Sequence, residues 1–149
     1  VLNREETESC NCGKKGCVEQ YCSATGVVRL AKGHLAATDA DSTLRSIPEL
    51  TCKDVFDAGK AGDAEALKIL DQVYRYLGEF LANVACVVNP EVIVLGGGVS
   101  KAGQPLLEGA KKYFDKYVFH AARDVRFELA QLGNDAGAYG AFKLILDEA

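Results

Sequence analysis

The sequence predicts a helix-rich α/β fold that has too few strands to complete a sheet of its own. Apolar residues recur at three- and four-residue steps between Asp63 and Pro90, which predicts one amphipathic helix of about 25 residues. The next segment, 91–95, is a nearly continuous apolar run, typical of a strand covered on both faces. Segment 124–132 alternates apolar and polar residues, as a half-exposed strand does. Because two strands alone make a marginal sheet, we expect part of the sheet to lie upstream.

Turn and capping residues divide the rest of the chain. The polar, glycine-containing segment 5–16 lacks apolar periodicity and predicts a loop. Thr51, with Asp54 three residues on, is typical of a helix N-cap. The apolar stripe of the long helix comprises Leu67, Leu70, Val73, Leu77, Phe80, Leu81, Val84 and Val88. The remaining predicted elements are helices at 18–24, from Val27 onward after a break at Thr25-Gly26, at 53–61, at 105–118 and at 136–148, with a turn at 42–48 and a cap at 133–135.

Composition and charge exclude several classes of protein. The chain has 149 residues, with 17 Lys and Arg against 21 Asp and Glu, and a formal net charge of -4. It has neither a basic run suited to the phosphate backbone of nucleic acid nor an apolar run of the roughly 20 residues that a bilayer requires. We expect a soluble, cytoplasmic protein that binds neither nucleic acid nor membrane. Because the chain begins with Val and contains no Met, we also expect a fragment of a longer protein.

Three cysteines, Cys10, Cys12 and Cys17, fall within eight residues and are accompanied by two glycines. Thiolates at this spacing can converge on one soft, tetrahedral cation, and zinc is the cation that the pattern favours. A disulfide or a cluster of reduced thiols is the alternative, but the redox poise of the cytosol disfavours disulfides. Zinc needs a fourth ligand. Since neither His34 nor His120 has a reason to reach this loop, we expect that ligand upstream of the chain.

Glu19 follows the cysteine motif at the start of a predicted helix, where the helix dipole keeps a carboxylate ionised. A fixed carboxylate beside a metal-braced loop can accept hydrogen bonds from vicinal hydroxyls of a polyol. From spacing alone, a plain acidic residue of the first helical turn is the better interpretation.

Two glycine-rich segments follow predicted strands. Gly96-Gly97-Gly98 precedes Val99-Ser100, so backbone can approach a flat ligand at the carboxyl end of a strand. A tight turn is an equal alternative, because the triplet lacks the Lys of a phosphate-binding loop and the spacing of a dinucleotide fingerprint. In the last predicted helix, Gly137 and Gly140 favour close packing on a neighbour.

Four motifs of the chain occur together in one known family. They are Cys10-x-Cys12-Gly13-x-x-Gly16-Cys17-x-Glu19, Ser23-Ala24-Thr25-Gly26, the run 89–100 and Gly133-Asn134-Asp135-Ala136-Gly137. This combination resembles the C-terminal half of bacterial ROK-family sugar kinases, and the Ser-Ala-Thr-Gly variant is most similar to their glucokinases. The resemblance spans essentially the whole chain. It implies the C-terminal domain of an actin-like ATPase, also described as ribonuclease H-like.

The resemblance also implies roles for the motifs. It implies structural Zn²⁺ at the three cysteines, with a histidine just before Val1 as fourth ligand, and Glu19 as a ligand of sugar hydroxyls. The turn 96–100 would lie against the adenosine of ATP. Residues 1–24 would form the zinc loop and the start of the sugar-contacting helix, and 25–149 the ATPase-type domain. The catalytic aspartate and the first phosphate-binding loop would lie upstream, so that this chain would hold no catalytic residue.

The function implied for the whole protein is phosphorylation of glucose at its 6-hydroxyl by Mg-ATP, and we expect this chain to be inactive alone. Other hexoses stay open as substrates, among them mannose, fructose, allose and N-acetylmannosamine. We expect a homo-oligomer, a dimer. The alternative function is the sugar-sensing half of a ROK-family transcriptional repressor, with a DNA-binding domain elsewhere. A stand-alone, metal-stabilised interaction module is a third class.

Overall fold

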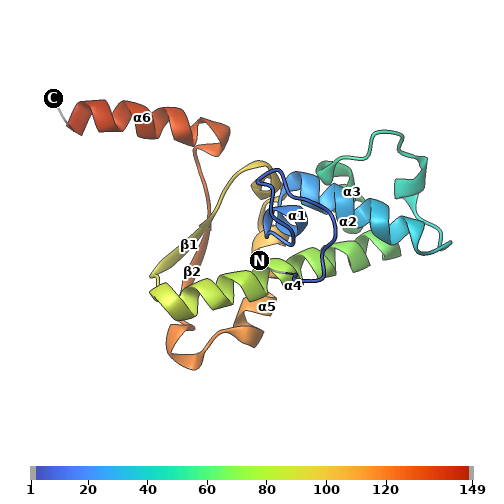
Figure 1. The fold of residues 1–149 in the computed structure, drawn as a ribbon, viewed down its shortest axis with the longest axis horizontal. Coiled ribbons are helices and arrows are strands. Elements are labelled where there is room, and N and C mark those ends of the chain that lie inside the picture. Colours follow the sequence, from blue (N-terminus) through green and yellow to red (C-terminus); the bar gives the residue numbers. More distant parts are fainter. Residues whose placement is uncertain (1–2, 148–149) are drawn as a thin grey trace.

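The computed structural model describes residues 3–147 and has a helix-rich α/β architecture (Figure 1). The α-helices are α1 (Glu19–Cys22), α2 (Ala24–Ala36), α3 (Cys52–Lys60), α4 (Ala64–Val88), α5 (Gln104–Tyr117) and α6 (Ala136–Asp147). The strands are β1 (Val92–Leu95) and β2 (Arg126–Leu129), and short 3-10 turns are η1 (Thr43–Ser46), η2 (Gly98–Ala102), η3 (His120–Ala122) and η4 (Gly133–Asp135). The predicted order of elements is confirmed.

The long helix α4 is the centre of the core, as the sequence predicts. Asp63 caps it by accepting hydrogen bonds from the backbone N–H groups of Glu65 and Ala66. At its other end Asn89 adopts a left-handed conformation, with φ of 44°, and stops the helix. Leu67 and Val88 belong to the predicted apolar stripe but are 49% and 62% exposed. Leu67 lies beside the buried stripe, since Ala66, Ile69 and Leu70 are buried, whereas Val88 lies beyond Ala85, the last buried residue of the helix.

Helix α5 packs along α4 and completes this core. Leu106, Ala110 and Phe114 of α5 are fully buried, and the Phe114 ring meets the Phe127 ring of β2 edge to face at 4.9 Å. Burial of these side chains removes apolar surface from water and holds the helix pair on the sheet.

The two strands pair in parallel, with Val92 opposite Arg126 and Leu95 opposite Leu129. Ile93 and Leu95 are buried, whereas Val94 is 57% exposed. The prediction that this strand is covered on both faces is therefore wrong for the described residues, since helices cover one face only. The half-exposed pattern predicted for the second strand is confirmed.

The break before α2 lies one turn earlier than predicted. Helix α2 begins at Ala24, and Ser23 caps it by accepting a hydrogen bond from the Gly26 backbone N–H. Gly26 thus lies inside the first turn of α2 rather than between two helices. The predicted N-cap at Thr51 is confirmed, because Thr51 and Asp54 form a reciprocal capping box at the start of α3.

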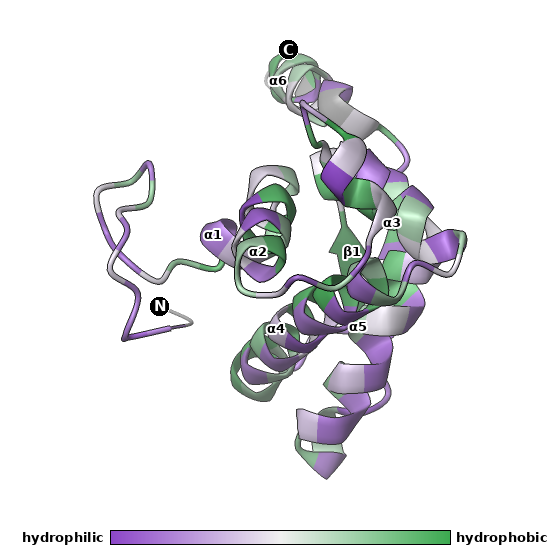
Figure 2. Ribbon diagram, turned by 90° about the vertical axis from the view of Figure 1, so that its right-hand side faces the viewer, coloured by the Kyte–Doolittle hydropathy of each residue, from purple (hydrophilic) through white to green (hydrophobic). Residues whose placement is uncertain are grey.

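Helix α6 lies apart from the other helices, at the end of the segment that follows β2 (Figures 1 and 2). Close packing was predicted at Gly137 and Gly140, but no heavy atom lies within 4 Å of a Cβ placed at either glycine. That prediction is wrong for the described part of the chain. Large apolar side chains of this helix are exposed, namely Tyr139, Phe142, Leu144, Ile145 and Leu146. Within residues 3–147, no helix combines the length and the apolar character needed to cross a membrane.

Candidate functional site

The three predicted cysteines come together in the loop before α1. The Sγ atoms of Cys10, Cys12 and Cys17 all lie within 4.8 Å of one another, and those of Cys12 and Cys17 are 3.5 Å apart. A tetrahedral zinc ion, with Zn–S bonds of about 2.3 Å, requires sulfur atoms about 3.8 Å apart. The three thiol groups therefore fit one such metal ion.

Backbone geometry closes this loop without help from a core. Gly13 and Gly16 adopt positive φ values of 81° and 70°, which L side chains rarely adopt. The Cys10 backbone N–H donates to the Lys14 carbonyl at 2.7 Å, and the Gly13 N–H donates to the Cys10 carbonyl at 2.8 Å. The two glycines of the motif are thus explained by the tight fold of the loop.

The thiols of the loop have shifted pKa values. A hydrogen bond from the Lys14 backbone lowers the pKa of Cys12, while the hydrogen bond with Cys12 raises the pKa of Cys17 to about 11. The thiolate form is therefore favoured at Cys12 and disfavoured at Cys17, whose Sγ atoms lie 3.5 Å apart. A divalent cation binds thiolates, so its binding here would release protons.

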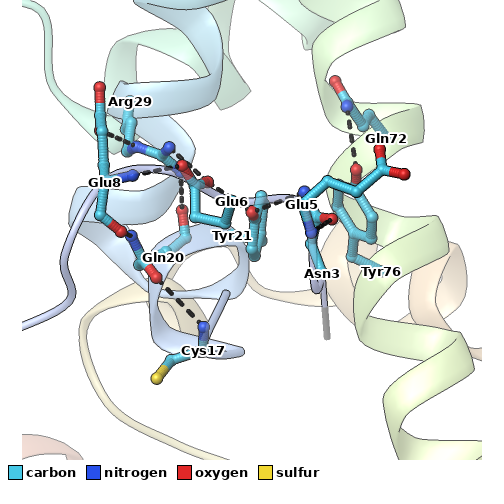
Figure 3. Close-up of polar contacts among 10 residues, drawn as sticks. All are labelled: Asn3, Glu5, Glu6, Glu8, Cys17, Gln20, Tyr21, Arg29, Gln72 and Tyr76. Atoms are coloured by element: carbon cyan, nitrogen blue, oxygen red, sulfur yellow. Dashed lines mark hydrogen bonds and ion pairs between the residues drawn. The ribbon is translucent and has the colours of Figure 1, made fainter. Parts of the chain in front are cut away.

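A buried amide joins the two ends of the cysteine loop (Figure 3). Gln20 is a buried residue, only 8% exposed. Its Oε1 accepts a hydrogen bond from the Cys17 backbone N–H at 3.1 Å, and its Nε2 donates to the Glu8 carbonyl at 3.0 Å. The sequence alone does not single out Gln20, because its local pattern is that of an ordinary helical glutamine.

A carboxylate clamp ties the same loop to α2. Glu6 Oε2 accepts hydrogen bonds from the Tyr21 hydroxyl and from Arg29 Nη2, each at 2.5 Å, and Arg29 Nε donates to Glu8 Oε2 at 2.7 Å (Figure 3). The hydrogen bonds from Tyr21, from the Glu8 backbone and from Arg29 lower the pKa of Glu6 to about 2. The Glu6 side chain is 8% exposed, so the ion pair with Arg29 is shielded from solvent at one end.

Glu19 is the first residue of α1, and its side chain is exposed. It lines a pocket of about 470 Å³ together with Gly96, Gly97, Gly98 and Val99. The structure therefore brings the predicted sugar ligand and the predicted adenosine turn to one pocket, although they lie far apart in the sequence. Glu19 also borders a smaller pocket of about 270 Å³ that Cys10 lines.

The glycine turn bends sharply after β1. Gly97 has a φ of 80°, a conformation that favours glycine, and η2 begins at the next residue. Ser100 does not line the shared pocket, and its hydroxyl donates to the Gly97 carbonyl at 2.8 Å. Of the five residues predicted for the nucleotide, Ser100 is thus placed inside the turn rather than on the pocket wall.

A further pocket, of about 290 Å³, lies on the α3 side of the same turn. Gly98 and Val99 line it together with Lys53, Phe56 and Lys101. The sequence alone does not single out these three side chains, because Lys53 and Phe56 follow the polar and apolar faces of an ordinary amphipathic helix and Lys101 carries no motif. Only the tertiary packing of α3 against η2 places them beside the turn.

The two histidines lie away from the cysteine loop, as predicted. His34 Nε2 lies 2.6 Å from Glu65 Oε2, where the buried carboxylate holds it, and His120 begins η3. In the part of the chain that the structure describes, the metal-binding group has three members.

Comparison with known proteins decides the family. The family model described as the ROK family matches residues 1–148. The chain belongs to the ROK family. A glucokinase of Halalkalibacterium halodurans is 46% identical to it over 144 residues, which cover 91% of this chain and 42% of that protein.

Solved structures of ROK proteins share the fold. A glucokinase of Streptomyces griseus, in complex with glucose and AMPPNP, matches with a TM-score of 0.78 and 32% identity, over 91% of this chain and 46% of that one. A ROK-family transcriptional regulator matches with a TM-score of 0.71 and 24% identity, over 87% of this chain and 33% of that one, which shows the fold alone. The chain spans less than half the length of these relatives. The predicted ROK sugar-kinase fold, of the actin-like ATPase type, is confirmed.

Proposed function

We propose that this chain is the C-terminal part of an ATP-dependent glucokinase, which transfers a phosphoryl group from Mg-ATP to the 6-hydroxyl of glucose. The longer protein that would contain it is called the parent protein below. One observation carries the proposal: Glu19 and the glycine turn line the same pocket, and Glu19 lies two residues after the last cysteine of the loop. The similarity to glucokinases of two genera supports glucose over other hexoses.

Glu19 serves as the hydroxyl ligand in this proposal. Its carboxylate accepts hydrogen bonds from adjacent sugar hydroxyls, and such charge-assisted bonds fix both the position and the orientation of the ring. Phosphoryl transfer depends on positioning and on stabilising charge, so a correctly held sugar accounts for much of the rate.

The turn 96–99 receives the nucleotide. Its three glycines present backbone without Cβ atoms, so the flat face of a base or ribose can come close to it. When bound, Mg²⁺ neutralises negative charge on the phosphate oxygens. The general base and the first phosphate-binding loop belong to the upstream part of the parent protein, so that this chain alone is inactive.

The cysteine loop holds Zn²⁺ in a structural role. Cys10, Cys12 and Cys17 provide three sulfur ligands, and a ligand outside the described residues provides the fourth. The metal-bound loop holds the start of α1 in place. It thereby sets the distance between Glu19, which binds the sugar, and the glycine turn 96–99, which binds the nucleotide.

Replacement of Glu19 tests the proposal. In the parent protein, we expect Glu19→Gln to lower kcat/KM for glucose about 10- to 100-fold, as loss of a hydrogen bond to a charged group does. Glu49→Gln is the matched control, because Glu49 is exposed and lies outside both pockets that Glu19 lines. The measurement is a coupled assay with glucose, mannose, fructose, allose and N-acetylmannosamine. Equal efficiency of Glu19→Gln and the unaltered protein would remove Glu19 from the site.

A further inference from the structure

We propose that Gln20 is a positioning residue, whose amide sets the metal loop against α1 and thereby places both Cys17 and Glu19. The inference rests on the proposed function for its link to the sugar, but its link to the metal stands on the loop geometry. In this proposal the Gln20 side chain contacts neither the metal ion nor the sugar. It acts through Cys17 and Glu19.

The burial of Gln20 shows that its amide has a fixed structural task. Gln20 and Glu65 are the buried polar residues of the described chain, at 8% and 3% exposure. A buried amide without partners costs free energy, and both ends of this one are bonded. The acceptor faces the Cys17 N–H, and the donor faces the Glu8 carbonyl.

These two hydrogen bonds join the two ends of the cysteine loop. Glu8 precedes the first cysteine, and Cys17 is the last, so one side chain spans the opening of the segment that carries all three thiols. The backbone adds to this link, because the Gln20 N–H donates to the Cys17 carbonyl at 3.0 Å. Arg29 Nη1 lies 3.4 Å from the Gln20 carbonyl and connects it to α2.

Helix α1 depends on this link for its position. It has four residues, and its N-cap, Val18, makes no side-chain capping bond. A helix this short is not stable by itself. It packs on α2 and on α4, where the Tyr21 ring lies 4.8 Å from the Tyr76 ring, and the amide of Gln20, the next residue after Glu19, ties it to the cysteine loop. Movement of Gln20 therefore moves the carboxylate and the last thiol together.

The proposal requires the hydrogen-bonding groups of the Gln20 amide, and a side chain of similar size that lacks them does not replace it. In Gln20→Glu, an oxygen replaces the nitrogen that donates to the Glu8 carbonyl, so two acceptors face each other. In Gln20→Met, the side chain keeps its length but can make neither bond. Gln72→Met is the matched control, because Gln72 is half-buried in α4 and its amide contacts Tyr76 instead.

The test uses the parent protein and two readouts. The first is zinc affinity, measured by competition with a chromophoric chelator, together with the visible absorption of the Co²⁺-substituted protein. Loss of outer-shell partners of metal ligands typically weakens affinity about 10- to 100-fold. We expect losses in this range for Gln20→Met and Gln20→Glu, with a changed Co²⁺ spectrum, and wild-type values for Gln72→Met.

The second readout is steady-state kinetics. We expect KM for glucose to rise about tenfold or more in both Gln20 variants, while KM for ATP stays constant, because the glycine turn is not attached to Gln20. A general loss of folded protein would lower the apparent kcat and leave both KM values unchanged.

Two results overturn the inference: wild-type zinc affinity in both Gln20 variants, or KM values for glucose and ATP that rise equally. If the unaltered parent protein does not phosphorylate glucose, the proposed function fails, and the chelator competition still decides the role of Gln20.

Discussion

Gly26 sets the spacing between α1 and α2, and its replacement by Ala tests how the sugar ligand is positioned. A Cβ at Gly26 would lie 2.7 Å from the Glu19 carbonyl oxygen and 2.8 Å from the Tyr21 backbone nitrogen. Both are backbone atoms, so neither can rotate away as a side chain would. The helix that carries Glu19 must therefore shift when a methyl group is added at this position.

The magnitude follows from a comparison with Gly33, in the same helix. A Cβ at Gly33 meets nothing within 4 Å, so Gly33→Ala gains helix propensity of about 1 kcal/mol. Gly26→Ala adds an overpacked contact that costs about 1–3 kcal/mol. Because both glycines lie in α2, the gain in helix propensity is common to the two variants, and we expect the free energy of unfolding of Gly26→Ala to be lower than that of Gly33→Ala by about 1–3 kcal/mol, measured by urea denaturation of the parent protein.

The shift of α1 should also reach the substrate. We expect KM for glucose to rise in Gly26→Ala and to stay unchanged in Gly33→Ala. Equal stability of the two variants would refute the steric argument. A destabilised Gly26→Ala protein with unchanged KM for glucose would refute the link between the helix spacing and Glu19.

Three further predictions concern other parts of the chain. Asp63→Ala removes the cap of α4, and we expect urea denaturation to show a loss of about 1–2 kcal/mol; Asp63→Asn keeps the capping oxygen but sets an amide nitrogen against the Thr43 backbone N–H, so we expect a smaller loss. The pKa of Glu6 is about 2 in the folded protein against an ordinary 4.5, so its contribution to stability is complete above pH 4.5 and is lost as pH falls toward 2. Acid unfolding of Glu6→Gln should be flatter over that range, and an unchanged profile would contradict the clamp. The apolar face of α6 is exposed, so we expect the chain purified alone to self-associate in sedimentation velocity, and Phe142→Glu with Ile145→Glu to reduce this; a monomeric wild-type chain would contradict it.

Local features of the fold were predictable from the sequence because their causes are local. The cysteine spacing, with glycines at 13 and 16, demands a tight loop, and both glycines do adopt positive φ values. The capping residues Thr51 and Asp63 mark the starts of α3 and α4, since each bonds the free N–H groups of the first turn.

Features that depend on a distant partner were not predictable. The apolar stripe of α4 could not show which of its residues face a partner, so Leu67 and Val88 were predicted to be buried and are exposed. The break at Thr25-Gly26 was misplaced because the glycine serves close packing of two helices and not a turn. Packing predicted for α6 depends on a surface that the described residues do not provide.

The residues of the candidate site likewise fall into those that a local motif marks and those that only the tertiary structure brings together. The cysteines and Glu19 carry a motif, so the sequence pointed to them directly. Gln20 carries no motif, and its role is visible only when Glu8 and Cys17 are seen on either side of its amide. The shared pocket of Glu19 and Gly96 depends on the packing of α1 beside the end of β1, which no local pattern encodes.

The central claim is that three thiolates hold one zinc ion and so fix the carboxylate that follows them. The most direct measurement is the metal content of the parent protein, purified without added metal, by inductively coupled plasma mass spectrometry. We predict equimolar zinc and chain, and loss of that zinc in Cys12→Ser together with a higher KM for glucose. Zinc absent from the unaltered protein, or retained in full by Cys12→Ser, would contradict the account.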